Sequence, residues 1–220
     1  MFNLTLWCIK MKKNVCLFVG AANASVIVQD QIEIISGTPS NQGGDATEVD
    51  YWYFTANTNG TVTIDTLSWL TDFDSDGEYY FMDPYIGLFN DDGSLDAADL
   101  ISLNDDSGST FSDGSVSSLD SFLSLSLNAG NYVLAITDYS TTTTDLVNGI
   151  NLNGLYPAYS SNGSSYIYNY RGNDISHADY QITFGGDVTV QNAQVPEPAT
   201  LALLSLGLAG IGFSRKKKTA

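Results

Sequence analysis

Residues 51–67 read YWYFTANTNGTVTIDTL, a stretch in which apolar and polar side chains alternate on both sides of a short polar break. Alternation that includes aromatic and β-branched residues is typical of strands with one buried face, so Tyr51–Ala56 and Thr61–Leu67 are predicted strands. Asn59-Gly60, which lies between them, is a dipeptide favoured in two-residue hairpin turns. The stretch therefore predicts an antiparallel hairpin.

Strand signals of the same kind recur along the chain, whereas helix signals are weak. The other predicted strands are Val26–Ile35, Tyr85–Phe89, Ser121–Leu127, Tyr132–Thr137 and Tyr180–Thr189. Strands at this spacing, with turn-rich connections, predict an all-β body: an antiparallel β-sandwich or jelly-roll-like ectodomain over residues 25–194. An insertion at about 139–179, rich in Ser, Thr, Asn, Gly and Tyr, departs from this pattern, and a loop of that length is usually functional or disordered.

The charge of the chain is strongly asymmetric. The 220 residues include 25 acids and 8 bases, for a formal charge of −17. Between Ser25 and Gln194, Arg171 is the only base against 24 acids, which gives this body a formal charge of −23. Phosphate binding needs clustered Lys and Arg, so the composition excludes a nucleic-acid binder that works through a basic face.

Residues 1–24 have the order of a secretory signal peptide. Met11-Lys12-Lys13 precedes the apolar Val15–Gly20 and the small-x-small cleavage site Ala22-Asn23-Ala24. Met11 is a candidate for the true start, and an N-terminal strand or helix of the fold is the alternative. Both cysteines, Cys8 and Cys16, lie in this segment, so the exported chain would contain no disulfide.

Residues 195–218 consist of three parts. Pro196, Glu197 and Pro198 precede an uncharged apolar run at about 199–213, and Arg215-Lys216-Lys217-Lys218 follows it. The run is near the short limit for a membrane span, and the basic cluster would stay cytoplasmic. The pattern therefore predicts a short C-terminal transmembrane helix that leaves the acidic body outside.

This tail closely resembles the PEP-CTERM sorting signal of Gram-negative bacteria, because the Pro-Glu-Pro motif, the apolar helix and the basic end all match. The resemblance implies Sec export, recognition by an exosortase, and cleavage near Pro196, Glu197 and Pro198. It also implies a producer of exopolysaccharide, and a protein that is membrane-anchored first and then reaches the cell surface or the extracellular matrix.

The body more weakly resembles the pre-peptidase C-terminal domain, a secreted β-sandwich. The stretches that carry this likeness are Asp50–Phe54 with Gly60–Val62, Asp83–Phe89 with Asp92-Gly93, Asn104–Asp106, and Leu127–Leu134. Members of that family are typically accessory modules, and several bind calcium. The resemblance also places the turn at Asp105 and Asp106 near Asp83.

The sharpest local motif has the form D-x-D-x-D-G and consists of Asp72, Asp74, Asp76 and Gly77. Carboxylates at alternate positions can converge on one cation, and Asp83 falls at the twelfth position, where a calcium loop places its closing carboxylate. That residue is usually Glu, and a solvated acidic loop is the alternative.

An acidic body without disulfides repels itself, and hard oxygen ligands suit Ca²⁺. The hypothesis is therefore that structural calcium stabilises the fold. Its predicted ligands are Asp72, Asp74, Asp76 and Asp83, joined by Asp105 and Asp106. Asp91, Asp92 and Asp96 are interpreted as turn residues.

Catalysis has little support in the sequence, and the protein is predicted not to be an enzyme. The single histidine, His177, is interpreted as a surface residue of the insertion. With no cysteine in the body, thiol–imidazole catalysis and a multi-histidine zinc site are excluded. A Ser–His–Asp triad around His177 stays arithmetically possible, but no G-x-S-x-G elbow accompanies it.

Tyr166, Tyr168 and Tyr170 alternate, so one face of a short strand would present all three as a sugar-binding strip or a packed flap. Trp52 is predicted to lie in the core. The favoured function is a structural or adhesive surface protein; the alternatives are a module that binds exopolysaccharide through the tyrosines and a secreted hydrolase.

Overall fold

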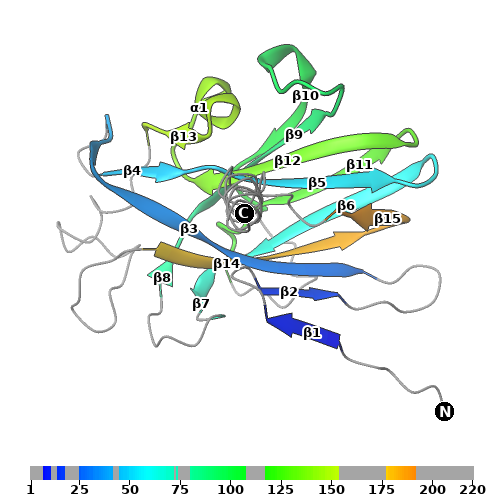
Figure 1. Cartoon of the computed structure of the whole chain (residues 1–220), viewed down its shortest axis with the longest axis horizontal. Helices are drawn as coiled ribbons and strands as arrows, with labels where there is room; N and C mark the ends of the chain where they lie inside the picture. Colours follow the sequence, from blue (N-terminus) through cyan, green and yellow to red (C-terminus); the bar gives the residue numbers. More distant parts are fainter. Residues whose placement is uncertain are drawn as a thin grey trace, which may run out of the picture.

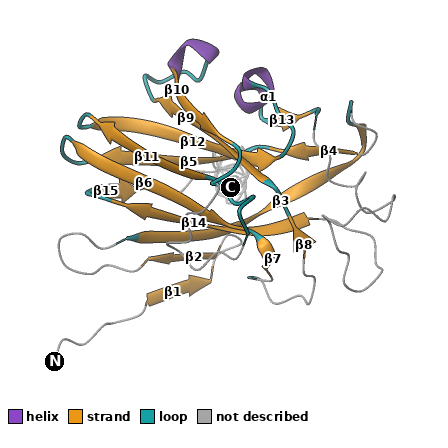
Figure 2. Cartoon of the chain, turned by 180° about the vertical axis from the view of Figure 1, so that it is seen from behind, coloured by secondary structure: helices purple, strands orange, loops and turns teal. Residues whose placement is uncertain are grey.

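Two antiparallel sheets face each other (Figure 1), and the apolar side chains of the alternating stretches form the core between them. The structure, a computed structural model, describes residues 7–10, 14–17, 25–41, 45–71, 73, 80–107, 117–153 and 177–191. Within these residues the body is all-β apart from one short helix and one 3-10 turn (Figure 2).

The first sheet has five strands in the order β10-β9-β12-β5-β15. Its strands are β5 (Asp50–Ala56), β9 (Pro84–Asn90), β10 (Leu100–Asn104), β12 (Gly130–Asp138) and β15 (Val188–Val190). β12 lies at the centre of this sheet and pairs with both β5 and β9, over seven residue pairs each.

The second sheet has six strands in the order β11-β6-β14-β3-β4-β13. Its strands are β3 (Val26–Pro39), β4 (Asp45–Glu48), β6 (Gly60–Leu67), β11 (Phe122–Leu127), β13 (Ile150–Asn151) and β14 (His177–Gly185). The first and last described stretches of the body, β3 and β14, lie side by side over eight residue pairs.

Two small hairpins accompany the sandwich. They are β1 (Trp7–Lys10) with β2 (Asn14–Leu17), and β7 (Trp69–Thr71) with β8 (Tyr80–Phe81). The first hairpin lies in the predicted signal peptide and contacts β3, while the second contacts β14.

The core between the sheets contains a buried polar chain. Trp52 is 2% exposed, as predicted, and its Nε1–H donates to Tyr180 Oη at 2.8 Å. The Tyr180 hydroxyl donates in turn to Asp50 Oδ2 at 2.7 Å. Since an unpaired buried polar group is costly, this chain fixes how β5 and β14 face each other across the core.

A second apolar cluster lies on the outer face of the five-stranded sheet, beneath α1 (Thr143–Asn148) and the 3-10 turn η1 (Ala97–Asp99). The helix begins with a capping box, because Thr142 and Asp145 each accept from the other's backbone N–H. Leu146 of α1 is fully buried against β9, where a Cβ on Gly87 would meet Leu146 Cδ1 at 2.7 Å. Glycine at this position therefore lets the helix approach the sheet.

The predicted hairpin at Asn59-Gly60 is wrong. β5 and β6 belong to opposite sheets, so the turn carries the chain across the sandwich rather than back along one sheet. Asn59 contributes by accepting the Ala129 N–H with its Oδ1 at 2.7 Å, which ties the turn to the neighbouring crossover.

The predicted strand Tyr180–Thr189 is two strands, β14 and β15, in different sheets. They separate at Gly186, which has φ 104°, and a Cβ there would meet the Thr61 carbonyl oxygen at 2.6 Å. The insertion at 139–179 contains α1 and β13 and ends in the first residues of β14; residues 154–176 lie outside the described part.

Candidate metal centre

Three carboxylates meet at one end of the β9–β10 hairpin. Asp83 directly precedes β9, while Asp105 and Asp106 directly follow β10. Asn104 pairs with Ile86, so the antiparallel register brings the start of β9 beside the end of β10. One carboxylate oxygen from each of Asp83, Asp105 and Asp106 lies within 4.8 Å of the other two.

A single serine ties this site to the opposite sheet. The Ser121 hydroxyl lies 2.6 Å from the Pro84 carbonyl, 2.9 Å from that of Asn104 and 2.6 Å from that of Asp105. A hydroxyl has one hydrogen, so it donates to these acceptors in turn. Ser121 is fully buried and fixes the two backbone segments that carry the acids.

Asn104 shapes the turn that presents Asp105 and Asp106. Its Oδ1 accepts the Phe122 N–H at 2.7 Å, and its Nδ2 donates to the Asp106 carbonyl at 3.2 Å. The backbone of Asp83 is held separately, because Tyr139 N–H donates to its carbonyl at 2.8 Å. Backbone hydrogen bonds therefore hold the three acids close together despite their like charge.

The carboxylates lack the donors that buried acids normally have. Asp83 Oδ1 and Asp105 Oδ1 are both buried and accept no hydrogen bond within the described structure. Burial, followed by the charges of Asp105, Asp106 and Asp120, raises the pKa of Asp83 from 3.8 to about 8. Burial and then the charge of Asp106 raise the pKa of Asp105 to about 6. Without a bound cation, this site opposes ionisation of its own side chains.

Asp120 adds a fourth negative charge that the sequence reasoning missed. It is fully buried, and its Oδ1 accepts from the backbone N–H of Ser68 at 3.0 Å and from the Ser68 hydroxyl at 2.9 Å. In the sequence, Asp120 could have been found by its position directly before the predicted strand Ser121–Leu127. In the structure, that position is at the end of the sandwich where Asp105 lies.

The sequence of the body offers very little positive charge to balance these acids. Arg171 is the only Lys or Arg between Ser25 and Gln194. Oxygen-only ligands at this spacing suit a hard divalent cation, and Asp83, Asp105 and Asp106 are the described residues that could hold one.

The structure therefore brings together three of the six predicted metal ligands. Asp72, Asp74 and Asp76 lie outside the described residues, so the D-x-D-x-D-G loop stays a prediction. Asp91, Asp92 and Asp96 are turn residues, as predicted. The Oδ1 atoms of Asp91 and Asp92 accept from Gly93 and Ser94, and Asp96 caps η1.

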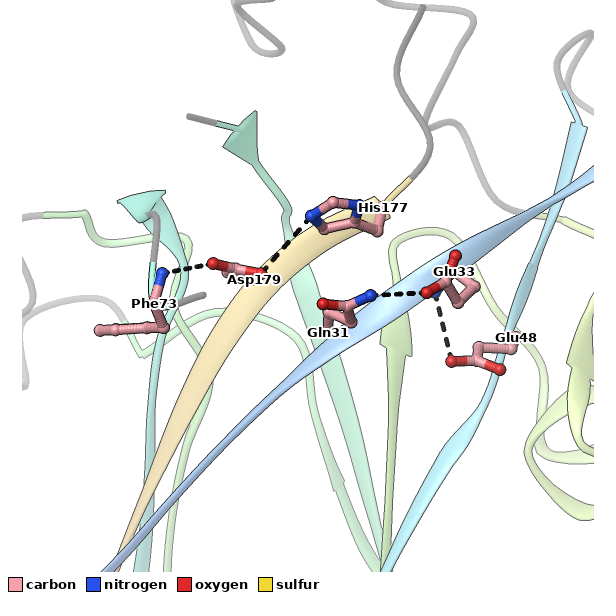
Figure 3. A network of polar contacts seen from close by, with 6 residues as sticks. All are labelled: Gln31, Glu33, Glu48, Phe73, His177 and Asp179. Carbon is pink, nitrogen blue, oxygen red and sulfur yellow. Dashed lines mark hydrogen bonds and ion pairs between the residues drawn. The ribbon is translucent and has the colours of Figure 1, made fainter. Parts of the chain in front are cut away.

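His177 is not a surface residue, which corrects the sequence interpretation. It is 7% exposed and begins β14, three residues before the predicted strand. Its Nε2 lies 3.8 Å from Asp179 Oδ1, and Asp179 Oδ2 accepts the Phe73 N–H (Figure 3). On the adjoining strands Gln31 Nε2 donates to Glu33 Oε1 at 2.6 Å, and Glu33 N–H donates to Glu48 Oε1 at 3.3 Å (Figure 3).

The reason for the burial of His177 is tertiary. β14 contacts β7 and β8, and the N–H of Phe73, which follows β7, bonds to Asp179 two residues after His177. The ring therefore lies next to an acid in a covered site. A catalytic role for it, as in a Ser–His–Asp triad, stays an untested alternative.

The remaining predicted sites fall outside the described part of the chain. They are the tyrosine strip Tyr166, Tyr168 and Tyr170, the sorting motif Pro196, Glu197 and Pro198, and the transmembrane helix at about 199–213. Among the residues that are described, none of the helices is long and apolar enough to cross a membrane.

Comparison with known families identifies the C-terminal segment. Residues 194–216 match the PEP-CTERM protein-sorting motif. None of the curated proteins compared matches the chain. The motif indicates an exported protein that is sorted by an exosortase and directed to the cell surface. The resemblance of the body to the pre-peptidase C-terminal domain stays a prediction.

Proposed function

We propose that this protein is a non-enzymatic structural or adhesive component of the cell surface or extracellular matrix, and that calcium bound by Asp83, Asp105 and Asp106 stabilises its β-sandwich. Two observations carry the calcium proposal. Asp83 and Asp105 each have a buried Oδ1 that accepts no hydrogen bond within the described structure, and one carboxylate oxygen of each lies within 4.8 Å of the other and of one from Asp106.

Buried acids of like charge are stable only when they are protonated, separated or neutralised by a cation. Backbone contacts through Ser121 and Asn104 oppose separation. Protonation of Asp83 at neutral pH costs stability relative to an unfolded chain in which this acid is ionised. A bound cation would remove both the repulsion between the ionised acids and the cost of protonating Asp83.

Calcium fits this donor set better than the other common divalent ions. Zinc and copper favour nitrogen and sulfur ligands, and magnesium needs near-ideal octahedral geometry. Ca²⁺ accepts irregular sets of carboxylate and carbonyl oxygens, with water completing the shell. The exported chain would lack disulfides. A divalent ion would instead link the segment before β9 to the turn after β10.

The test is thermal unfolding of the exported protein in calcium, in magnesium and after treatment with a chelator. Calcium in about 100-fold excess over its dissociation constant should stabilise the fold by roughly 3 kcal/mol. For a domain of this size that corresponds to a rise of roughly 5–10 °C in melting temperature. Magnesium at the same concentration should produce a smaller rise. An unchanged melting temperature after chelation would refute the calcium proposal.

The non-enzymatic part of the proposal rests on the inventory of reactive groups. The body has no cysteine and a single histidine. Screening glycan and peptide substrates with the exported protein tests it. Turnover that single Asp substitutions abolish would replace the structural function with a hydrolase.

A further inference from the structure

The four outer edges of the two sheets differ in how they are protected from pairing with other chains. An unpaired edge presents free N–H and C=O groups, so natural sheets shorten, bend or charge such strands. β15 has three residues, β13 has two, and β10 has a register shift between Leu100 and Ser102. β11 has none of these features, because its six residues pair with β6 in uninterrupted register.

β11 is also uncharged in a strongly acidic chain. Its sequence is FLSLSL, and no charged residue occurs between Asp120 and Asp138. Serine side chains at positions 124 and 126 are exposed on the outer face, while leucines at 123 and 127 are buried in the core. Leu125 is only half-buried, although it packs against the same core.

The direction of the backbone groups follows from the pairing with β6. Thr66 N–H donates to the Ser121 carbonyl at 3.0 Å, so the backbone of Ser121 faces β6. Backbone direction alternates along an antiparallel strand, so the leucines bond to β6 and Ser124 and Ser126 direct their N–H and C=O groups away from it. We call the side of β11 at Ser124 and Ser126 the free edge. At the start of the strand the Phe122 N–H on this side donates to Asn104 Oδ1 at 2.7 Å, whereas within the described structure no strand pairs with β11 along Ser124 and Ser126.

We propose that the free edge of β11 pairs with β11 of a second copy of this chain. A two-fold axis at Leu125 would place Ser124 of each copy opposite Ser126 of the other. Each Ser124–Ser126 pair then exchanges both backbone hydrogen bonds, and the two half-buried Leu125 side chains cover each other. The six-stranded sheets of the two copies become one continuous sheet.

The sequence of the strand favours a second copy over a different protein as the occupant. A two-fold axis at Leu125 places Leu123 of one copy opposite Leu127 of the other, and Ser124 opposite Ser126, so like side chains meet. A basic partner protein would bind preferentially at the acidic turns, because β11 has no charged residue to attract it. Repulsion between two bodies of −23 opposes the pairing and is screened by salt, so self-association should strengthen as ionic strength rises.

The test is sedimentation of the full-length chain in density-matched detergent at tens of micromolar, with excess calcium present throughout. Ser126→Pro removes an N–H group at the free edge without removing a hydrogen bond to β6, and proline is tolerated on edge strands. The substitution occurs twice in the dimer, so its dissociation constant should rise roughly 10- to 100-fold. Ser126→Thr, which keeps the N–H, is the matched control and should dimerise like the wild type.

Ser124→Lys provides a second variant in case the proline disturbs folding, which the melting temperature reports. It adds a charge to the free edge and should also yield monomers. A wild-type chain that stays monomeric at 0.5 M salt would overturn the proposal. The same holds if the folded Ser126→Pro or Ser124→Lys variant dimerises as tightly as the wild type. Neither result bears on calcium binding, because the metal ligands are unchanged.

Discussion

Replacing Asp83 with asparagine should have opposite effects with and without calcium. In the metal-free protein Asp83 is a half-buried acid beside Asp105, Asp106 and Asp120, and its Oδ1 has no donor. Asn keeps the shape and removes the charge. The variant should therefore be more stable than the wild type in chelator and should lose the calcium response.

The size of the effect follows from the pKa of Asp83, which rises from 3.8 to about 8. At pH 7 the metal-free protein takes up a proton there, at a cost set by the difference between pH 7 and 3.8. That difference of about 3 units corresponds to roughly 4 kcal/mol as an upper limit. Asparagine also buries an amide N–H₂ group in place of a carboxyl oxygen, and such a group without an acceptor costs about 1–3 kcal/mol. A net gain of roughly 2 kcal/mol should raise the metal-free melting temperature by roughly 4–8 °C.

The assay is calorimetric unfolding of wild type and Asp83→Asn, each in chelator and in saturating calcium. Asp92→Asn is the matched control, because it removes the same charge from the exposed β9–β10 turn and can keep the contact with Ser94. The control should respond to calcium like the wild type. The reasoning is refuted if Asp83→Asn melts below the wild type in chelator, or if calcium stabilises both equally.

Three further predictions concern the fold and its dependence on pH. Tyr180→Phe removes the hydroxyl between Trp52 and Asp50, and should cost roughly 2–4 kcal/mol in urea unfolding without changing the calcium response; a neutral result would contradict the role of this chain. Gly87→Ala drives a methyl group into Leu146 and should cost roughly 1–3 kcal/mol, part of which Leu146→Ala in the same chain restores; an additive double variant would contradict the contact. Because the folded-state pKa of Asp83 is raised, the metal-free protein should lose stability as pH rises from about 4 to 8, measured by its melting temperature. Saturating calcium or Asp83→Asn should reduce that loss.

The alternation of side chains located most long strands, because burial of one face imposes a two-residue period. The predicted strands at Tyr51–Ala56, Thr61–Leu67 and Ser121–Leu127 agree with β5, β6 and β11 to within one residue. The assignment of strands to sheets was not predictable in the same way. Asn59-Gly60 favours a hairpin locally, but β5 and β6 contribute to the same core from opposite sheets, and the alternation of a strand does not reveal which sheet it joins.

Short elements escaped the pattern because they are fixed by tertiary contacts. The strands β4, β10 and β13 are too few residues long to show a period. The helix α1 did have a local signal, since Thr142-x-x-Asp145 before Leu146 is a capping pattern within the insertion. His177 was misplaced because its burial is tertiary: β14 contacts β7 and β8, which are distant in the sequence, and no local pattern reports such contacts.

The candidate metal centre illustrates the same limit. The position of Asp105 and Asp106 beside Asp83 followed from a family resemblance, because β10 itself was not predicted. The role of Asp120 depends on Ser121, whose hydroxyl reaches backbone carbonyls on both other segments. A contact between three distant chain segments produces no repeating pattern in the sequence, so it could not be predicted from the spacing of residues.

The metal centre and the free edge of β11 share one structural element, yet they can be separated by experiment. Asn104 belongs to the turn that presents Asp105 and Asp106, and its Oδ1 also binds the first N–H of β11 at Phe122. Loss of calcium would therefore loosen the start of β11, but Ser124 and Ser126 are held in place by the neighbouring leucines, which bond to β6 and not to Asn104. It follows that chelation should weaken self-association only slightly, whereas Ser126→Pro should weaken it roughly 10- to 100-fold at any calcium concentration. If chelation and Ser126→Pro were equally effective, the turn at Asn104, and not the uncharged strand, would control the assembly of copies.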